Sequence, residues 1–236
     1  MICYYFLKPF KNSFLLSAFI KNFLEPFSYL IYAVAFLLEY RTHKSMREKI
    51  LFIYYLVAVV IISYACSIAL DYDKDNNWLY NIYYFLSAIV FGYYFNSILI
   101  RKINKTIVTI LFALAAINFI VTDLIFWHPF FNSFSNAFLY VCMVISSLIY
   151  LHELLNNMSE KNILLNFNLW VVSGYIIYFL GGFLIILSYS YFTDKFTYDQ
   201  RSILGTLWSI LNVLLFITST ITLSSHIWIA YRTRSR

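Results

Sequence analysis

The sequence predicts an all-α membrane protein, a seven-transmembrane helix bundle with an N-terminal interfacial amphipathic helix. Of 236 residues, 62% are hydrophobic and 12% are charged, whereas a soluble domain has about 25% charged residues. Apolar stretches of the length that a helix needs to cross a bilayer recur along the chain. The alternation of apolar and polar residues that is typical of membrane barrel strands does not occur. This composition disfavours a soluble enzyme and excludes a disordered chain.

Residues 1–22 predict an interfacial amphipathic segment. Their apolar residues are interrupted by Lys8, Pro9, Lys11 and Lys21, which favours a helix that lies on the membrane rather than across it. The basic start and small-residue cleavage site of a secretory signal peptide are missing. A single helix that continues from about Ser13 through a kink at Pro26 is the alternative.

Residues 23–236 form one domain, because no connecting segment is long enough to fold alone. Asp123 is the only acid well inside a predicted span, and Glu25 interrupts the first span near its start. The spans are predicted at about 23–40, 50–70, 77–100, 106–127, 133–155, 167–192 and 203–231.

The basic residues predict the orientation. Eleven of the seventeen Lys and Arg residues fall in alternate connections and at the C-terminus, against three in the connections on the other side. Positive charge marks the cytoplasmic side, so we expect a multi-pass protein of the inner (plasma) membrane, N-terminus outside and C-terminus cytoplasmic. The net charge of +6 is explained by contact with anionic lipid and predicts no nucleic-acid partner.

Polar groups inside the spans are the candidates for a ligand site, because they are costly in a membrane. Asp123, one turn before the outer end of its span, fits a proton or cation site or a ligand anchor, or an interfacial acid near the aromatic residue Trp127. Gly174 fits either close helix packing or a ligand groove. The last span has Asn212 above a run of hydroxyls, which can bond back to the helix carbonyls, and we expect it to line any internal cavity. The candidate ligand-binding residues are Asp123, Asn118, Trp170, Gly174, Tyr178, Trp208 and Asn212.

Metal and catalytic sites have weaker support. His152 and Glu153 resemble the start of a zinc-protease motif, but Asn156 stands where the second histidine is needed. Together with His226 they would make an intramembrane metal enzyme, although satisfied interfacial polar residues are the simpler interpretation. The loop from Asp71 to Asn76 has acids at calcium-loop spacing but lacks the Gly and Glu that such a loop needs. We assign no catalytic residue, metal or cofactor.

Residues 80–231 carry moderately specific motifs. They are Phe131-Asn132-Ser133-Phe134-Ser135, Tyr150 with Glu153, Leu169-Trp170 before Gly174 and Tyr178, and Leu207-Trp208 before Asn212. The pattern resembles a group of small, uncharacterised bacterial seven-helix membrane proteins, with Leu169 in place of a usual Phe. The group is similar to membrane sensor modules that work beside signalling kinases, and it defines no catalytic residues. The resemblance implies seven helices.

Two functions follow as hypotheses. The first is a sensor or receptor-like module that binds a small or lipid-like ligand within the bundle and contacts a cytoplasmic signalling partner through its basic loops. The alternative is a small-molecule or ion transporter or channel. The lipid bilayer is an expected partner in both, and a homo-oligomer stays open.

Overall fold

The computed structural model describes residues 23–71, 77–125, 133–157, 163–195 and 198–234. The expected interfacial segment 1–22 and most of the acidic loop after Asp71 lie outside the described residues. Within them, every regular element is helical. The long helices are α2 (Leu24–His43), α3 (Met46–Asp71), α4 (Asn77–Ile98), α5 (Lys102–Phe119), α6 (Ser133–Asn157), α7 (Phe167–Lys195) and α8 (Tyr198–Arg234). A π-helical segment η2 (Ile120–Ile125) continues α5, and a 3₁₀ turn η3 (Ile163–Leu165) precedes α7.

The helices begin and end where charge or polarity returns to the sequence. Lys44 closes α2 in a left-handed conformation, φ 52°, and its N–H donates to the Tyr40 carbonyl. Only Leu99 to Arg101 separate α4 from α5. For the fourth expected span, 106–127, α5 begins four residues earlier and continues as the π-helical η2; for the seventh, 203–231, α8 begins five residues earlier and ends three residues later. The all-α prediction is confirmed.

Five helical segments in the described residues are long and apolar enough to cross a membrane. They are Met46–Ala65, Lys102–Thr122, Ser133–Asn157, Phe167–Leu187 and Thr206–Thr233. The two helices outside this group are more polar: α2 contains two glutamates and an arginine, and α4 contains five tyrosines and three asparagines. Length and composition therefore support a membrane protein with several transmembrane helices.

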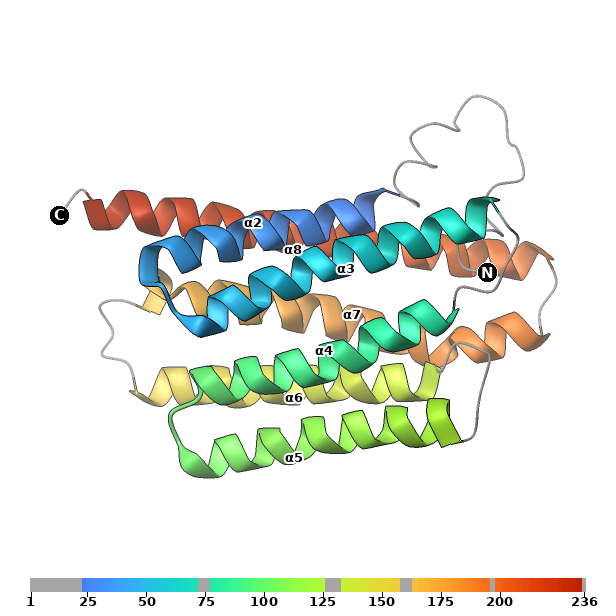
Figure 1. The fold of residues 1–236 in the computed structure, drawn as a ribbon, viewed down its shortest axis with the longest axis horizontal. Helices are drawn as coiled ribbons and strands as arrows, with labels where there is room; N and C mark the ends of the chain where they lie inside the picture. Colours follow the sequence, from blue (N-terminus) through green and yellow to red (C-terminus); the bar gives the residue numbers. More distant parts are fainter. Residues whose placement is uncertain (1–22, 72–76, 126–132, 158–162, 196–197, 235–236) are drawn as a thin grey trace.

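Six of the helices form a closed ring. Going round it, α2 packs on α3, α3 on α4, α4 on α6, α6 on α7, α7 on α8, and α8 returns to α2. The remaining helix, α5, lies outside the ring against α4 and α6 (Figure 1). The connections α2–α3 and α4–α5 and the C-terminal end of α8 all lie at one end of the bundle. We call this the basic end, because Lys44, Arg101, Lys102 and Arg232 lie there.

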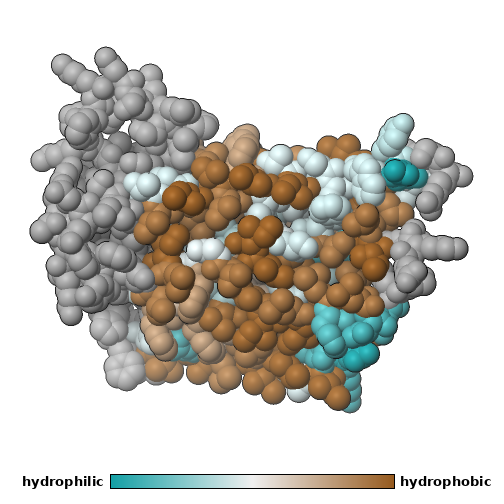
Figure 2. Space-filling model, turned by 180° about the vertical axis from the view of Figure 1, so that it is seen from behind, coloured by the Kyte–Doolittle hydropathy of each residue, from teal (hydrophilic) through white to brown (hydrophobic). Residues whose placement is uncertain are grey.

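Tyrosine fills the ring. Among the described side chains, buried tyrosines come from α2, α3, α4, α6 and α7, and their rings stack at centroid distances such as 4.9 Å for Tyr32 and Tyr55. Their hydroxyls find partners inside: Tyr55 with Tyr175 at 2.6 Å, and Tyr54 with Ser87 at 2.6 Å. An aromatic ring with a polar tip suits such a position, since a buried hydroxyl needs a partner. The outer surface, by contrast, is mainly hydrophobic on the face in Figure 2.

Two α7 glycines let neighbouring helices approach closely. A Cβ at Gly182 would lie 2.6 Å from the Tyr140 ring, and one at Gly174 would lie 3.2 Å from Thr218 Cβ. Gly181, which shares a face with Gly174 by spacing, is exposed and would meet only Leu214 at 3.3 Å. The packing interpretation of these glycines therefore holds for Gly174 and Gly182.

Candidate functional site

One face of α2 points into the ring and carries two carboxyl groups. Glu25, Tyr29, Tyr32, Phe36 and Glu39 follow one another at intervals of three or four residues, so they share a helix face. All five side chains are buried. The carboxyls are 14 residues apart, which is about 21 Å along the helix axis.

Glu25 lies among aromatic side chains. It is only 6% exposed, and the Tyr29 hydroxyl donates to its Oε1 at 3.4 Å. The Trp208 side chain of α8 also hydrogen-bonds this carboxyl group. Of the described basic side chains, none forms an ion pair with Glu25. Among the described residues, the hydrogen-bond partners of the Glu25 carboxyl group are therefore neutral donors.

Four tyrosines from α4, α6 and α7 complete the surroundings of Glu25. The hydroxyls of Tyr83, Tyr84, Tyr140 and Tyr178 lie near enough to interact with its carboxyl electrostatically. The rings of these four tyrosines form a row of contacts. The ring centroids of Tyr83 and Tyr84 are 5.2 Å apart, and those of Tyr140 and Tyr178 are 6.1 Å apart. We call the group the Glu25 cage. Its members are Glu25, Tyr29, Tyr83, Tyr84, Tyr140, Tyr178 and Trp208.

Unpartnered polar atoms mark two further ring residues. Asn212 lies one turn after Trp208 on α8, is 1% exposed, and its Nδ2 has no hydrogen-bond partner among the described residues. Asn136 lies one turn before Tyr140 on α6, is fully buried, and lacks described partners at both side-chain polar atoms. Buried polar atoms are nearly always paired in proteins. The two amides therefore add unused hydrogen-bonding capacity on the helices that carry the cage.

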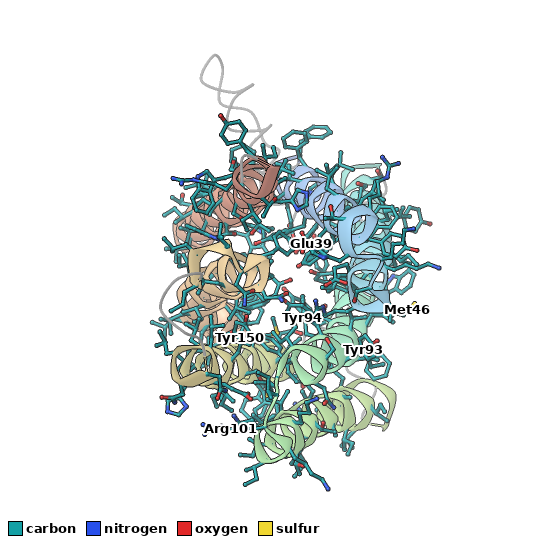
Figure 3. The ribbon with its side chains drawn as sticks, turned by 90° about the vertical axis from the view of Figure 1, so that its left-hand side faces the viewer. Glu39, Met46, Tyr93, Tyr94, Arg101 and Tyr150 are labelled. Atoms are coloured by element: carbon teal, nitrogen blue, oxygen red, sulfur yellow. The ribbon has the colours of Figure 1, made fainter. Side chains whose placement is uncertain are left out.

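Glu39 occupies the other end of the α2 face, near the basic end. Its Oε2 lies 2.7 Å from His226 Nδ1 on α8, and its Oε1 lies 3.3 Å from His43 Nε2. Figure 3 views this end of the bundle, where the labelled Glu39, Tyr94 and Tyr150 lie on the inner side of the helices and Tyr93 lies outside. Glu39 and His226 thus tie α2 to α8.

Hydroxyl groups also lie inside the ring between the levels of Glu25 and Glu39. Tyr32 donates to Thr218 Oγ1 at 3.1 Å, and Tyr94 donates to Asn168 Oδ1 at 3.0 Å. On α8, Thr218 and Thr222 donate to carbonyls one turn earlier, at 3.0 and 2.9 Å. This is the back-bonding that the sequence predicts for the hydroxyl run. The run lines the ring interior, where Thr218, Thr222 and Ser225 are buried.

Glu153 has a structural role at the start of α5. Its Oε1 accepts the N–H of Ile100 at 2.8 Å and that of Arg101, and its Oε2 accepts Asn104 Nδ2 at 3.2 Å. Arg101, the N-cap residue, makes no side-chain cap, and Glu153 of α6 instead holds the backbone N–H groups of Ile100 and Arg101, directly before the first turn of α5. His152 lies beside Asn156, and His226 pairs with Glu39. The three residues of the metal hypothesis are not brought together in the described structure.

The predicted ligand residues separate into two groups. Gly174, Tyr178, Trp208 and Asn212 are all buried, and Tyr178 and Trp208 belong to the Glu25 cage.

The other group lies away from the cage. Asn118 donates to Ser135 at 2.8 Å between α5 and α6, and the Trp170 indole donates to the Leu164 carbonyl at 3.0 Å. Asp123 lies in η2, and its side chain is outside the described residues.

Sequence reasoning missed the central residue of the cage. Glu25 follows the start of a span and precedes Pro26, so it resembles a boundary residue. The signal that would have found it is the repeat of three and four residues through Tyr29, Tyr32 and Glu39. Comparison of the chain with protein-family models, curated proteins and solved structures finds no match.

Proposed function

We propose that the chain is a receptor-like membrane module that binds a small cationic ligand at the Glu25 cage. The observation that carries the proposal is the burial of Glu25 beside the Tyr29 hydroxyl, within electrostatic reach of four further tyrosines. A carboxylate attracts a cation, and aromatic faces stabilise cations further, most strongly where water is excluded. An ionisable residue inside a membrane helix also marks a functional site by default.

The proposal includes seven crossings, with the basic end in the cytoplasm. The helices α2 and α4 have 20 and 22 residues, which is enough to span a hydrocarbon core of about 30 Å. Their polar residues are acceptable in a membrane because both helices belong to the ring and turn those residues inward. The positive-inside rule orients the bundle.

We propose that the module passes its signal to a partner at the basic end. The contact between Glu39 and His226 joins α2, which carries Glu25, to α8, which carries Trp208. A ligand that moves α2 against α8 at the cage would therefore act on this contact. A signalling partner at the basic loops is in keeping with the resemblance to sensor-like seven-helix proteins.

Binding of simple cations to purified protein in lipid nanodiscs tests the proposal. Tetramethylammonium, methylammonium and sodium are the probes, and thermal stability and tryptophan fluorescence are the readouts, because Trp208 touches Glu25. We expect at least one cation to stabilise the wild type and to change its fluorescence, and Glu25→Gln to abolish both effects. Glu48→Gln removes an equal charge from α3 and should keep them. A response that is unchanged in Glu25→Gln would contradict the proposal.

Transport is the second candidate function. The observation that favours it is the series of buried hydroxyls on the ring helices between Glu25 and Glu39, about 21 Å apart. Proteoliposomes that enclose a pH-sensitive dye test it under an imposed proton or sodium gradient. Transport predicts a flux that both Glu25→Gln and Glu39→Gln abolish. Cation binding without flux would favour the receptor.

A further inference from the structure

A groove of about 250 Å³ runs between α4 and α5. Its floor consists of small or apolar residues, Ala88 and Gly92 from α4 and Phe112, Ala113 and Ala116 from α5. It exists because the two helices meet closely at one point, where a Cβ on Gly92 would lie 2.9 Å from Phe112 Cβ. Small residues on either side of that contact leave space unfilled.

The groove opens on the outer surface of the bundle. It lies beside α5, the helix outside the ring, and its rim residues Ile89 and Tyr93 are 51% and 44% exposed. On a membrane protein such a surface meets lipid tails. The groove is therefore separate from the Glu25 cage, which lies inside the ring.

One end of the groove is polar and lies next to the basic end. Asn96 and Thr109 both line it, and Asn96 Nδ2 donates to Thr109 Oγ1 at 2.9 Å. Lys102 and Lys105 precede Thr109 by seven and four residues, so they share its face of α5 and continue the line beyond the groove. Among the described residues, neither lysine forms an ion pair, and Glu153, which contacts the start of α5, is 2% exposed and accepts the N–H groups of Ile100 and Arg101. The two lysines thus leave positive charge at the polar end.

We propose that this groove binds an anionic phospholipid, with an acyl chain along Ala88, Gly92, Ala113 and Ala116 and the phosphate beside Lys102 and Lys105. The apolar floor fits the hydrocarbon, the Asn96–Thr109 pair lies at the ester level, and the lysines neutralise the headgroup. A second copy of the chain fits less well. Two copies in one bilayer have the same orientation, so a symmetric contact through this groove would bring their lysine pairs together.

Native mass spectrometry of delipidated protein tests the site, with phosphatidylglycerol and phosphatidylcholine carrying identical acyl chains as probes. We expect the wild type to retain one phosphatidylglycerol in preference to phosphatidylcholine. Each basic side chain near a membrane surface changes affinity for anionic lipid about fivefold. The double variant Lys102→Gln, Lys105→Gln should therefore lose most of the preference. Arg41→Gln, at the same end but on α2, should retain it.

A second variant tests the acyl-chain part. Ala113 is exposed, so Ala113→Phe fills the groove without entering the core, and thermal unfolding verifies that it folds. This variant should bind phosphatidylglycerol and phosphatidylcholine more weakly by the same factor, so that the preference for phosphatidylglycerol is unchanged. Retention of the lipid by Ala113→Phe, or of the preference by the lysine variant, would overturn the proposal. So would a dimer that Ala113→Phe dissociates, because the groove would then be an interface between copies.

Discussion

The helices α2 and α5 differ in how apolar they are and in how deeply they are buried, and the two properties do not go together. The helix α2 has two glutamates on its inner face and is not among the five most apolar helices, yet it lies in the ring with that face enclosed. The helix α5 belongs to the apolar five, yet only 22% of its span is buried, against 50% for α6. Between these two helices, the more apolar sequence belongs to the less buried helix.

This difference affects where function should be sought. A helix that faces lipid must be apolar, since the bilayer solvates no polar group. A helix that faces other helices is free to carry polar and ionisable side chains, because neighbours supply the partners. In the Glu25 cage, α2 contributes the carboxyl group, and the tyrosine and tryptophan side chains of the cage come from α2, α4, α6, α7 and α8. Four substitutions test this interpretation, from the largest expected effect to the smallest.

The first tests whether α5 faces lipid. Leu114 lies in the middle of α5 and is 50% exposed. Leu114→Lys should lower stability by about 3 kcal/mol, because a lysine at bilayer depth is costly. Leu114→Ala should change it by less than about 0.5 kcal/mol, because little packing is lost. Denaturant unfolding in mixed micelles measures both. If α5 were enclosed, the alanine variant would also unfold early.

The second tests whether α5 is held at its end rather than by burial. Glu153→Ala removes the acceptor of three hydrogen bonds and should cost about 2.5 kcal/mol, because two backbone N–H groups lose a charged partner. Glu153→Gln keeps one oxygen for those N–H groups and should cost less than half as much. Thermal unfolding compares the variants. Equal loss in both would show that charge, not capping, fixes the start of α5.

The third tests how tightly the ring is packed. Gly182→Ala would place a Cβ 2.6 Å from the Tyr140 ring and should cost about 2 kcal/mol through overpacking. Gly181→Ala, the adjacent control, meets only the end of the Leu214 side chain and should cost about 0.5 kcal/mol or less. Urea unfolding distinguishes them. A similar loss of stability in both variants would mean that the ring helices move apart easily to make room for the added methyl group.

The fourth tests the hydroxyls inside the ring. Tyr55→Phe removes the 2.6 Å contact with Tyr175 and should cost about 1 kcal/mol, the usual worth of one hydrogen bond. Tyr93→Phe removes a hydroxyl from an exposed tyrosine of α4 and should change stability by less than about 0.5 kcal/mol. The same unfolding assay applies. No difference would indicate that the inner hydroxyls contribute nothing to stability.

The long helices follow from the sequence because charges mark where each apolar run stops. Arg41 and Lys44 lie at the end of α2, and Arg101 and Lys102 mark the start of α5. The position of α5 outside the ring does not follow, since it depends on α4 meeting α6 directly. The contact between α4 and α6 also explains the hydrogen bonds of Glu153. Its pairing with Ile100 and Arg101 requires the end of α6 to meet the α4–α5 connection, which no spacing in the sequence indicates.

The candidate site could be predicted only in part for a similar reason. Tyr178 and Trp208 attract notice as polar or aromatic residues in long apolar spans, and both are in the cage. Glu25 looks like the edge of a span until its spacing to Tyr29 and Tyr32 is considered, and only the structure brings Tyr84 and Tyr140 to it. Asn118 is equally prominent in the sequence but serves the contact between α5 and α6.

The closure of the ring by α2 and α8 sets an order of events during synthesis. Glu39 and His226 are 187 residues apart in the chain, so a ribosome working at about 5–20 residues per second needs about 10–40 s between them. During that interval α2 has been made, but Trp208, Thr218 and His226 of α8 have not. In a chain that stops before α8, Glu25 and Glu39 therefore keep only their partners on α2 itself, Tyr29 and His43, and the ring stays open.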